Sequence, residues 1–150
     1  MVTPMELFFQ TFEQLSAASN AAELAGLYAP SFLMAGPNGS QVVRAIDLQH
    51  AIPKRKELFT SVGCTATHLT ALEETVLDDR YSLVRTEWRW HFERSPEAPV
   101  AFTLPSSFVI DRSLDRWQIV AYIPHADVMA ELRQRGLLAA GSAHTGGGSE

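Results

Sequence analysis

The sequence has one cysteine, no long hydrophobic run and no excess of positive charge, and each absence removes a class of protein. Cys64 has no second cysteine with which to form an intramolecular disulfide, which fits the reducing cytoplasm. No apolar stretch reaches the length of about 18 residues that a membrane span needs. Glu6 and Glu13 near the start do not fit a signal peptide. We therefore expect a cytoplasmic protein with no membrane partner.

The charge balance argues against a nucleic-acid partner. Lys and Arg number 12 against 17 Asp and Glu, which gives a net charge of −5. Binding to a phosphate backbone requires clustered Lys and Arg side chains. The only dense basic stretch is Lys54-Arg55-Lys56, which Glu57 follows at once, and its position predicts an exposed helix face.

Metal and cofactor sites are not expected either. No two histidines stand four residues apart, and none lies in a cluster of carboxylates, so the spacing of a zinc or iron site is missing. No motif for an organic cofactor was identified.

The length of 150 residues and the hydrophobic content of 46 % predict one globular domain with a sizeable core. We place this domain at residues 1–138. The Gly/Ser-rich segment 139–150 is expected to be a disordered tail.

Helical signals come first along the chain. Thr3, Pro4 and Glu6 form a capping pattern, and a helical spacing of apolar residues follows. A second short helix is predicted from Asn20 to Pro30, with a stripe of Leu24, Leu27 and Tyr28. A β-hairpin is predicted around residues 36–39, and a helix over 45–61 that Pro53 should break or bend. A last helix is expected over 125–135.

From Cys64 onward the hydrophobic period changes to two. The ranges 64–77, 81–94, 100–112 and 116–123 read as strands, and the short breaks between them predict an antiparallel meander. In the strand 81–94 the even positions from 84 to 92 are apolar or Thr, which predicts one buried and one exposed face. The exposed positions are Arg85, Glu87, Arg89 and His91. Helices followed by an antiparallel sheet give an α+β architecture.

Two segments, together with this element order, resemble the nuclear transport factor 2-like (NTF2-like) superfamily, which includes the SnoaL-like cyclases and ketosteroid isomerase. They are 27–32 followed by Gly36-Pro37, and 117–122. The resemblance spans roughly residues 4–135. It implies a curved antiparallel sheet, cone-shaped and wrapped around the N-terminal helices, with an apolar cavity and a tendency to form homodimers.

The resemblance does not carry over a catalytic set. Where ketosteroid isomerase-like members have an oxyanion-donating Tyr and a general-base Asp, this chain has Phe12 and Gly36, and Ser106 falls near their second donor. Proton abstraction needs a base and a charge stabiliser. In epoxide hydrolase-like members an Arg lies between carboxylates inside the cavity, whereas Arg85 is predicted to point outward. The histidines that dehydratase-like members pair are not diagnostically spaced here.

The leading hypothesis is therefore a domain that binds a small hydrophobic or aromatic molecule in an aromatic-lined cavity. Its predicted ligand-binding residues are Phe12, Tyr28, Met34, His50, Trp88, Trp90, Ser106 and Tyr122. One alternative is an enzyme of the cyclase, dehydratase or isomerase kind, with His50 or Tyr122 as acid or base; His68 and His125 are further candidates. Another is a dimeric interaction module whose outer sheet face is the working surface. Whether a reaction is catalysed stays open, and no catalytic residue is assigned.

Overall fold

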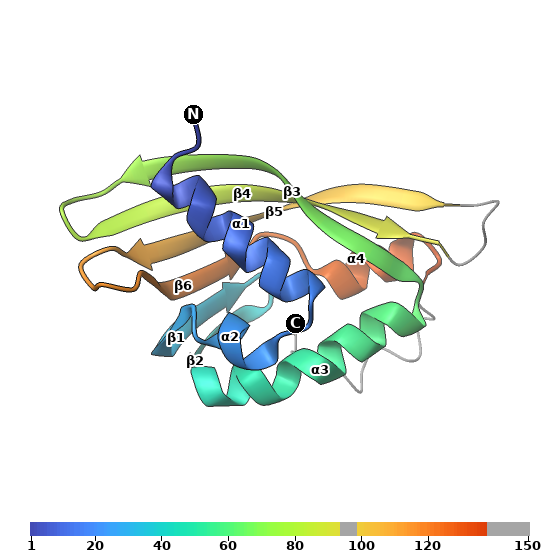
Figure 1. Ribbon diagram of the computed structural model, residues 1–150. Helices are drawn as coiled ribbons and strands as arrows, with labels where there is room; N and C mark the ends of the chain where they lie inside the picture. The colour runs from blue at the N-terminus through green and yellow to red at the C-terminus, as the bar shows by residue number, and fades with distance from the viewer. Residues whose placement is uncertain (94–98, 138–150) are drawn as a thin grey trace.

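A computed structural model describes residues 1–93 and 99–137 of the chain (Figure 1). The predicted tail at 139–150 lies outside this part. The element order is α1 (Pro4–Ala17), α2 (Ala21–Ala25), β1 (Tyr28–Gly36), β2 (Gly39–Arg44), α3 (Ala45–Ser61), β3 (Cys64–Val76), β4 (Tyr81–Phe92), β5 (Val100–Asp111), β6 (Gln118–Pro124) and α4 (Val128–Gln134). The α+β class predicted from the sequence is confirmed. No helix in the described ranges is long and apolar enough to cross a membrane.

The strands form one six-stranded sheet in the order β2-β1-β6-β5-β4-β3. The predicted meander is confirmed, since β3 to β6 pair antiparallel with their neighbours in sequence. The parallel pairing of β1 with β6, which joins the hairpin β1–β2 to the meander, was not predicted. Four register shifts interrupt three of the strand pairs, and such bulges bend a sheet.

Helix α1 begins as its capping pattern predicts. The Glu6 backbone N–H donates to the Thr3 hydroxyl oxygen at 3.1 Å, and the Thr3 N–H donates to the Glu6 carboxylate at 2.7 Å. The helix crosses in front of the sheet (Figure 1) and buries Met5 and Phe9 against it. We call the sheet face covered by the helices the inner face and the opposite one the outer face.

The expectation that Pro30 ends the second helix was wrong. Helix α2 ends at Ala25, and Tyr28 begins β1 instead of ending the helix. Pro30 lies within β1, in the gap between the paired residues Tyr28 and Leu33 of the β1–β6 ladder and before the β1–β2 pairing starts, so its missing N–H breaks no ladder bond.

Helix α3 continues through Pro53 from Ala45 to Ser61. Proline removes one hydrogen bond from a helix interior and disfavours the preceding turn. Here the helix packs Ile52 and Phe59 on either side of Pro53 against the core, and this tertiary packing outweighs the local cost.

The core consists of two clusters. The larger lies under α1 and α2 and includes Phe9, Trp88 and Phe108. The smaller joins the end of α3 and α4 to Phe92 and Phe102 of the sheet. The predicted alternation in β4 is confirmed, because Val84, Thr86, Trp88 and Phe92 are buried while Arg85 and Arg89 are exposed.

Candidate functional site

Aromatic rings from α1 and the sheet meet on the inner face. The centroid of the Phe9 ring lies 5.0 Å from that of Phe108, and the Phe12 centroid lies 5.6 Å from Trp88 and 5.7 Å from Phe108. Tyr28 joins them from β1, with its ring centroid 6.3 Å from that of Phe12. These distances are those of favourable edge-on and tilted aromatic pairs. The predicted wall residues Phe12, Tyr28 and Trp88 are thus brought together.

A buried polar network crosses this aromatic face. The Trp88 indole N–H donates to Thr86 Oγ1 at 2.9 Å, and Thr86 Oγ1 lies 2.9 Å from Ser106 Oγ and 2.9 Å from the Ser106 carbonyl oxygen. Ser106 was predicted as the polar break in an apolar strand face, and its hydroxyl is held by Thr86. Buried polar groups that find partners in this way cost little.

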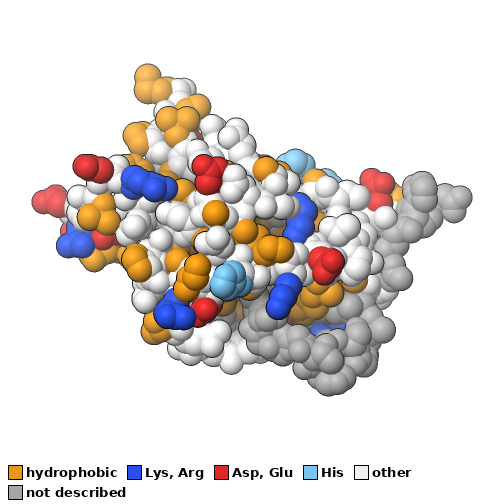
Figure 2. Space-filling view, turned by 60° about the horizontal axis from the view of Figure 1, so that its bottom comes forward, with side chains coloured by type: hydrophobic (Ala, Val, Ile, Leu, Met, Phe, Trp, Pro, Cys, Tyr) orange, Lys and Arg blue, Asp and Glu red, His pale blue; other side chains and the backbone are white. Residues whose placement is uncertain are grey.

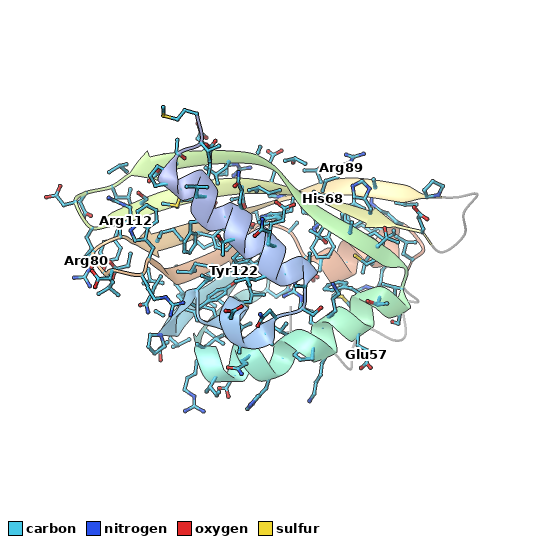
Figure 3. All side chains as sticks on the ribbon, viewed as in Figure 1. Glu57, His68, Arg80, Arg89, Arg112 and Tyr122 are labelled. Carbon is cyan, nitrogen blue, oxygen red and sulfur yellow. The ribbon has the colours of Figure 1, made fainter. Side chains whose placement is uncertain are left out.

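Besides Phe12 on α1, three of the predicted residues are half-buried on the inner face. They are Met34, Trp90 and Tyr122, and all pack against the larger core cluster. The Tyr122 ring stacks on Phe108 with centroids 5.0 Å apart, and Figure 3 shows it at the middle of the molecule on β6. Trp90 meets Phe59 of α3 edge-on at 5.0 Å. The inner face is therefore closed under α1 and less covered toward α3.

Tyr28 is the strongly perturbed titratable group of this face. Burial raises the pKa of its phenol well above the usual range, the neighbouring Tyr122 raises it further, and Arg55 opposes the shift. The hydroxyl consequently remains protonated at physiological pH. A neutral buried phenol can donate a hydrogen bond to an acceptor, which is the polar contact predicted for a ligand.

The predicted histidine does not reach this face. His50 is exposed on α3. It stands two residues from Leu48, which packs on the core, and two residues turn a helix by about 200°. The space-filling view, with its bottom turned forward, shows a mixed surface in which charged and His side chains are interspersed with small hydrophobic areas (Figure 2).

The other histidines are engaged elsewhere. His68 Nδ1 lies 3.2 Å from a Glu13 carboxylate oxygen, and its ring is 5.5 Å from that of His91. His68 pairs in register with Arg89 on the outer side of β4 (Figure 3). His125 Nε2 lies 2.7 Å from Ser107 Oγ, which alternates with Ser106 and so belongs to the outer face. No group of three or more metal-ligating side chains occurs in residues 1–93 and 99–137.

Arg55 was not predicted as a site residue. The basic tripeptide Lys54-Arg55-Lys56 was assigned to an exposed helix face, and this holds for Lys54 and Lys56, but Arg55 is half-buried. Its guanidinium carbon lies 5.2 Å from the centroid of the Phe59 ring. The available signal was its helical spacing from the apolar residues Ile52 and Phe59.

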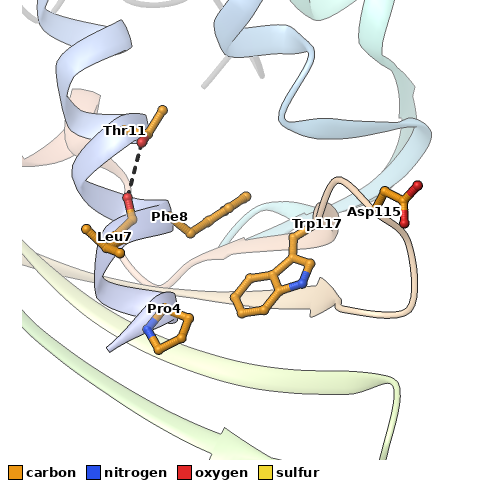
Figure 4. A pocket seen from close by; sticks show the side chains of 6 residues that line it. All are labelled: Pro4, Leu7, Phe8, Thr11, Asp115 and Trp117. Carbon is orange, nitrogen blue, oxygen red and sulfur yellow. Dashed lines mark hydrogen bonds between the residues drawn. The ribbon is translucent and has the colours of Figure 1, made fainter. Parts of the chain in front are cut away.

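Two of the hollows on the surface of the described residues are lined by none of the predicted ligand-binding residues. One of about 320 Å³ lies beside the start of α1. Figure 4 shows the six side chains that line it: Pro4, Leu7, Phe8, Thr11, Asp115 and Trp117. The other, of about 210 Å³, lies at the far end of β4 and β5 beside Phe92 and Val100.

Comparison with solved structures assigns the fold. A protein from Novosphingobium aromaticivorans, described as NTF2-like with a cystatin-like fold, superposes with a TM-score of 0.67 at 14 % identity, over 89 % of this chain and 86 % of that one. The chain has the NTF2-like fold. The resemblance seen in the sequence is confirmed at this level. No family model and no curated protein matches the chain.

Two further solved structures are similar over most of their length. An NTF2-like protein of unknown function from Shewanella oneidensis has a TM-score of 0.63 at 14 % identity, over 81 % of this chain and 96 % of that one. A protein from Catenulispora acidiphila, solved in complex with S-DNPA, has a TM-score of 0.65 at 11 % identity, over 85 % of this chain and 93 % of that one. At these identities the likeness concerns the fold and not the function.

Proposed function

We propose that the protein binds a small hydrophobic or aromatic molecule on the inner face of its sheet, on the side toward α3. The observation that carries the proposal is the half-buried state of Met34, Trp90 and Tyr122, which share this face with fully buried rings. Apolar and aromatic side chains with a few placed polar groups are typical of ligand sites. The structurally similar Catenulispora acidiphila protein was solved in complex with S-DNPA, which is compatible with this role.

An enzyme of the cyclase, dehydratase or isomerase kind is the second candidate and has less support. None of His50, His68 and His125 lies on the inner face among the described residues, so a histidine base is missing there. Burial raises the pKa of the Cys64 thiol, which disfavours a thiolate nucleophile. Tyr122 is the remaining candidate acid from the predicted set.

The binding proposal predicts that filling the inner face will expel the ligand. The protein is purified gently and denatured, and the released molecules are identified by mass spectrometry. We expect a stoichiometric apolar compound from the wild type and at least a tenfold smaller amount from Met34→Trp, because an indole at this half-buried position occupies the space of the ligand.

The matched control is Ser40→Trp, which adds an indole at an exposed position of the neighbouring strand β2 and should keep the ligand. Circular dichroism spectra verify that both variants fold. If the wild type releases no compound and a thermal-shift screen of aromatic compounds finds none that stabilises it, the binding proposal is wrong and the interaction module takes its place.

The second part of the proposal is a homodimer formed through the outer face. A row of apolar residues runs in register across five strands there: Val42, Leu33, Ala121, Val109 and Leu83. Val42 and Leu33 are 73 % and 40 % exposed, which is unusual for apolar side chains that stand next to each other on a sheet. Both signs of charge flank the row, since Arg85 pairs in register with Glu73. A second copy would therefore meet complementary charges.

We expect Val42→Asp to convert the dimer into a monomer in multi-angle light scattering, because a carboxylate would be buried without a partner at the interface. Ile46→Asp introduces the same charge at a 47 % exposed position of α3 and should leave the dimer intact. The dimer would be refuted if the wild-type protein is monomeric at about 100 µM. A dissociation constant of that size corresponds to a binding free energy of about −5.5 kcal/mol.

A further inference from the structure

Arg55 lies on the side of α3 that faces the core. The residues that share this side are spaced three or four apart, as one face of a helix requires: Leu48, Ile52, Arg55, Phe59 and Val62. The first two pack against the larger core cluster, and the last two are buried in the smaller one. Arg55 is therefore a cation at the junction of the two clusters, where an apolar residue would continue the stripe.

No carboxylate within residues 1–93 and 99–137 forms an ion pair with this cation. The ion pairs of the described residues involve other side chains, and none of these residues forms a side-chain hydrogen bond with Arg55. The guanidinium instead packs against the face of the Phe59 ring. Glu57, its nearest acidic neighbour in sequence, is exposed on the side of α3 that points away from the sheet (Figure 3). A half-buried cation on the core-facing side of the helix would be stabilised by an anion beside it, so this position favours an anionic ligand.

A hydrogen-bond donor accompanies the cation. Tyr28, which is 8 % exposed, lies close enough to Arg55, and to Tyr122 on the adjacent strand β6, for both to act on the pKa of its phenol. Because the Tyr28 phenol stays protonated, it offers an O–H to an oxygen acceptor. A guanidinium and a phenol beside aromatic rings can bind an aromatic acid. The guanidinium neutralises its carboxylate, the phenol donates a hydrogen bond to it, and the rings stack on its ring.

We propose that the ligand of the inner face is a small aromatic carboxylate, with its ring against Trp90 and Tyr122 and its carboxylate paired with Arg55 and hydrogen-bonded by Tyr28. This inference rests on the proposed binding function and adds the chemical class of the ligand. A single carboxylate suits the site better than a phosphate ester, because Arg55 is its only half-buried cation on this stripe, and the planar guanidinium fits the fork of a carboxylate.

The test compares two probes with the same ring system, 2-naphthoate and the neutral 2-naphthamide, by isothermal titration with the full chain. We expect the wild type to bind 2-naphthoate about tenfold or more tightly than 2-naphthamide, as a charge-assisted hydrogen bond would give. Arg55→Gln should bring the two affinities within about twofold of each other while the affinity for 2-naphthamide stays unchanged. Arg55→Lys keeps the charge and should retain part of the preference.

The control is Lys54→Gln, which removes an exposed charge from the adjacent position and should leave the preference intact. Equal binding of the two probes to the wild type would overturn the inference and leave the binding function standing. If neither probe binds, the inference is overturned as well. The mass spectrometry of molecules released from the purified protein then tests the binding function separately. If the preference for 2-naphthoate survives in Arg55→Gln but is lost in Lys54→Gln, the carboxylate binds at the exposed Lys54, and the inference is overturned. Retained 2-naphthamide binding shows that Arg55→Gln is folded.

Discussion

Replacing Phe9 with alanine is expected to lower the free energy of unfolding by about 3–5 kcal/mol. Its side chain has no exposed surface and contacts Phe108 from the sheet. The cost combines the lost transfer energy of the ring with the cavity left between α1 and the sheet, which the surrounding rings fill only in part. Urea denaturation followed by far-ultraviolet circular dichroism measures it, with tryptophan fluorescence as the second probe of the same transition.

The matched control is Leu7→Ala on the same helix. Leu7 is 54 % exposed, and leucine and alanine are both good helix formers, so we expect a change within about 0.5 kcal/mol. If Phe9→Ala costs no more than Leu7→Ala, then α1 does not dock on the inner face in solution. That result would also remove the closed part of the candidate site.

The sheet was the most predictable part of the fold, because its two faces have different environments. In β4 the alternation of Trp88 with Arg89 fixes which side is buried, and a slip by one residue would expose both indoles of the strand. The capping box at Thr3 and Glu6 is equally local, and it identifies the start of α1 from four consecutive residues. Such features depend on neighbours in sequence or on a simple period.

The parts that were not predicted depend on residues far apart in sequence. Tyr28 was assigned to a helix because it continues an apolar stripe, but β6, some 90 residues later, offers it a parallel partner at Ile119. Of the two alternatives for Pro53, the break into two helices is wrong, because α3 is continuous where its inner side packs on the core. In both cases tertiary contacts outweigh a local preference.

For the candidate site, residue type identified the aromatic cluster, whereas the positions of Arg55 and His50 on their helix were not used. Large aromatic residues of α1 and of the inward-facing strand positions gather on the inner face, where they share one cluster with Met34: Phe12, Tyr28, Trp88, Trp90 and Tyr122. Arg55 was missed because it lies in a basic tripeptide, where composition suggests solvent exposure. His50 was chosen for its chemistry, although its helical position relative to Leu48 turns it away from this face.

Thr86 holds the polar network of the inner face together, because its one hydroxyl serves two neighbours. It accepts the hydrogen bond of the Trp88 indole and contacts Ser106 at both the hydroxyl and the carbonyl oxygen. Thr86 itself is fully buried. Water cannot replace it easily in so closed a position, so removal of its hydroxyl leaves buried groups without partners.

We expect Thr86→Val, which keeps the shape of the side chain, to lower the free energy of unfolding by about 2–3 kcal/mol, since the Trp88 N–H and the Ser106 hydroxyl lose their partner. Ser106→Ala should cost about 1 kcal/mol or less, because Thr86 can still accept from Trp88 and donate to the Ser106 carbonyl. In the double variant the cost of Thr86→Val should fall, as no Ser106 hydroxyl is then left unpaired, and a double-mutant cycle in urea measures this coupling. Equal costs for the two single variants with no coupling would mean that the hydroxyl of Thr86 does not organise the face, and that packing alone holds Trp88 in place.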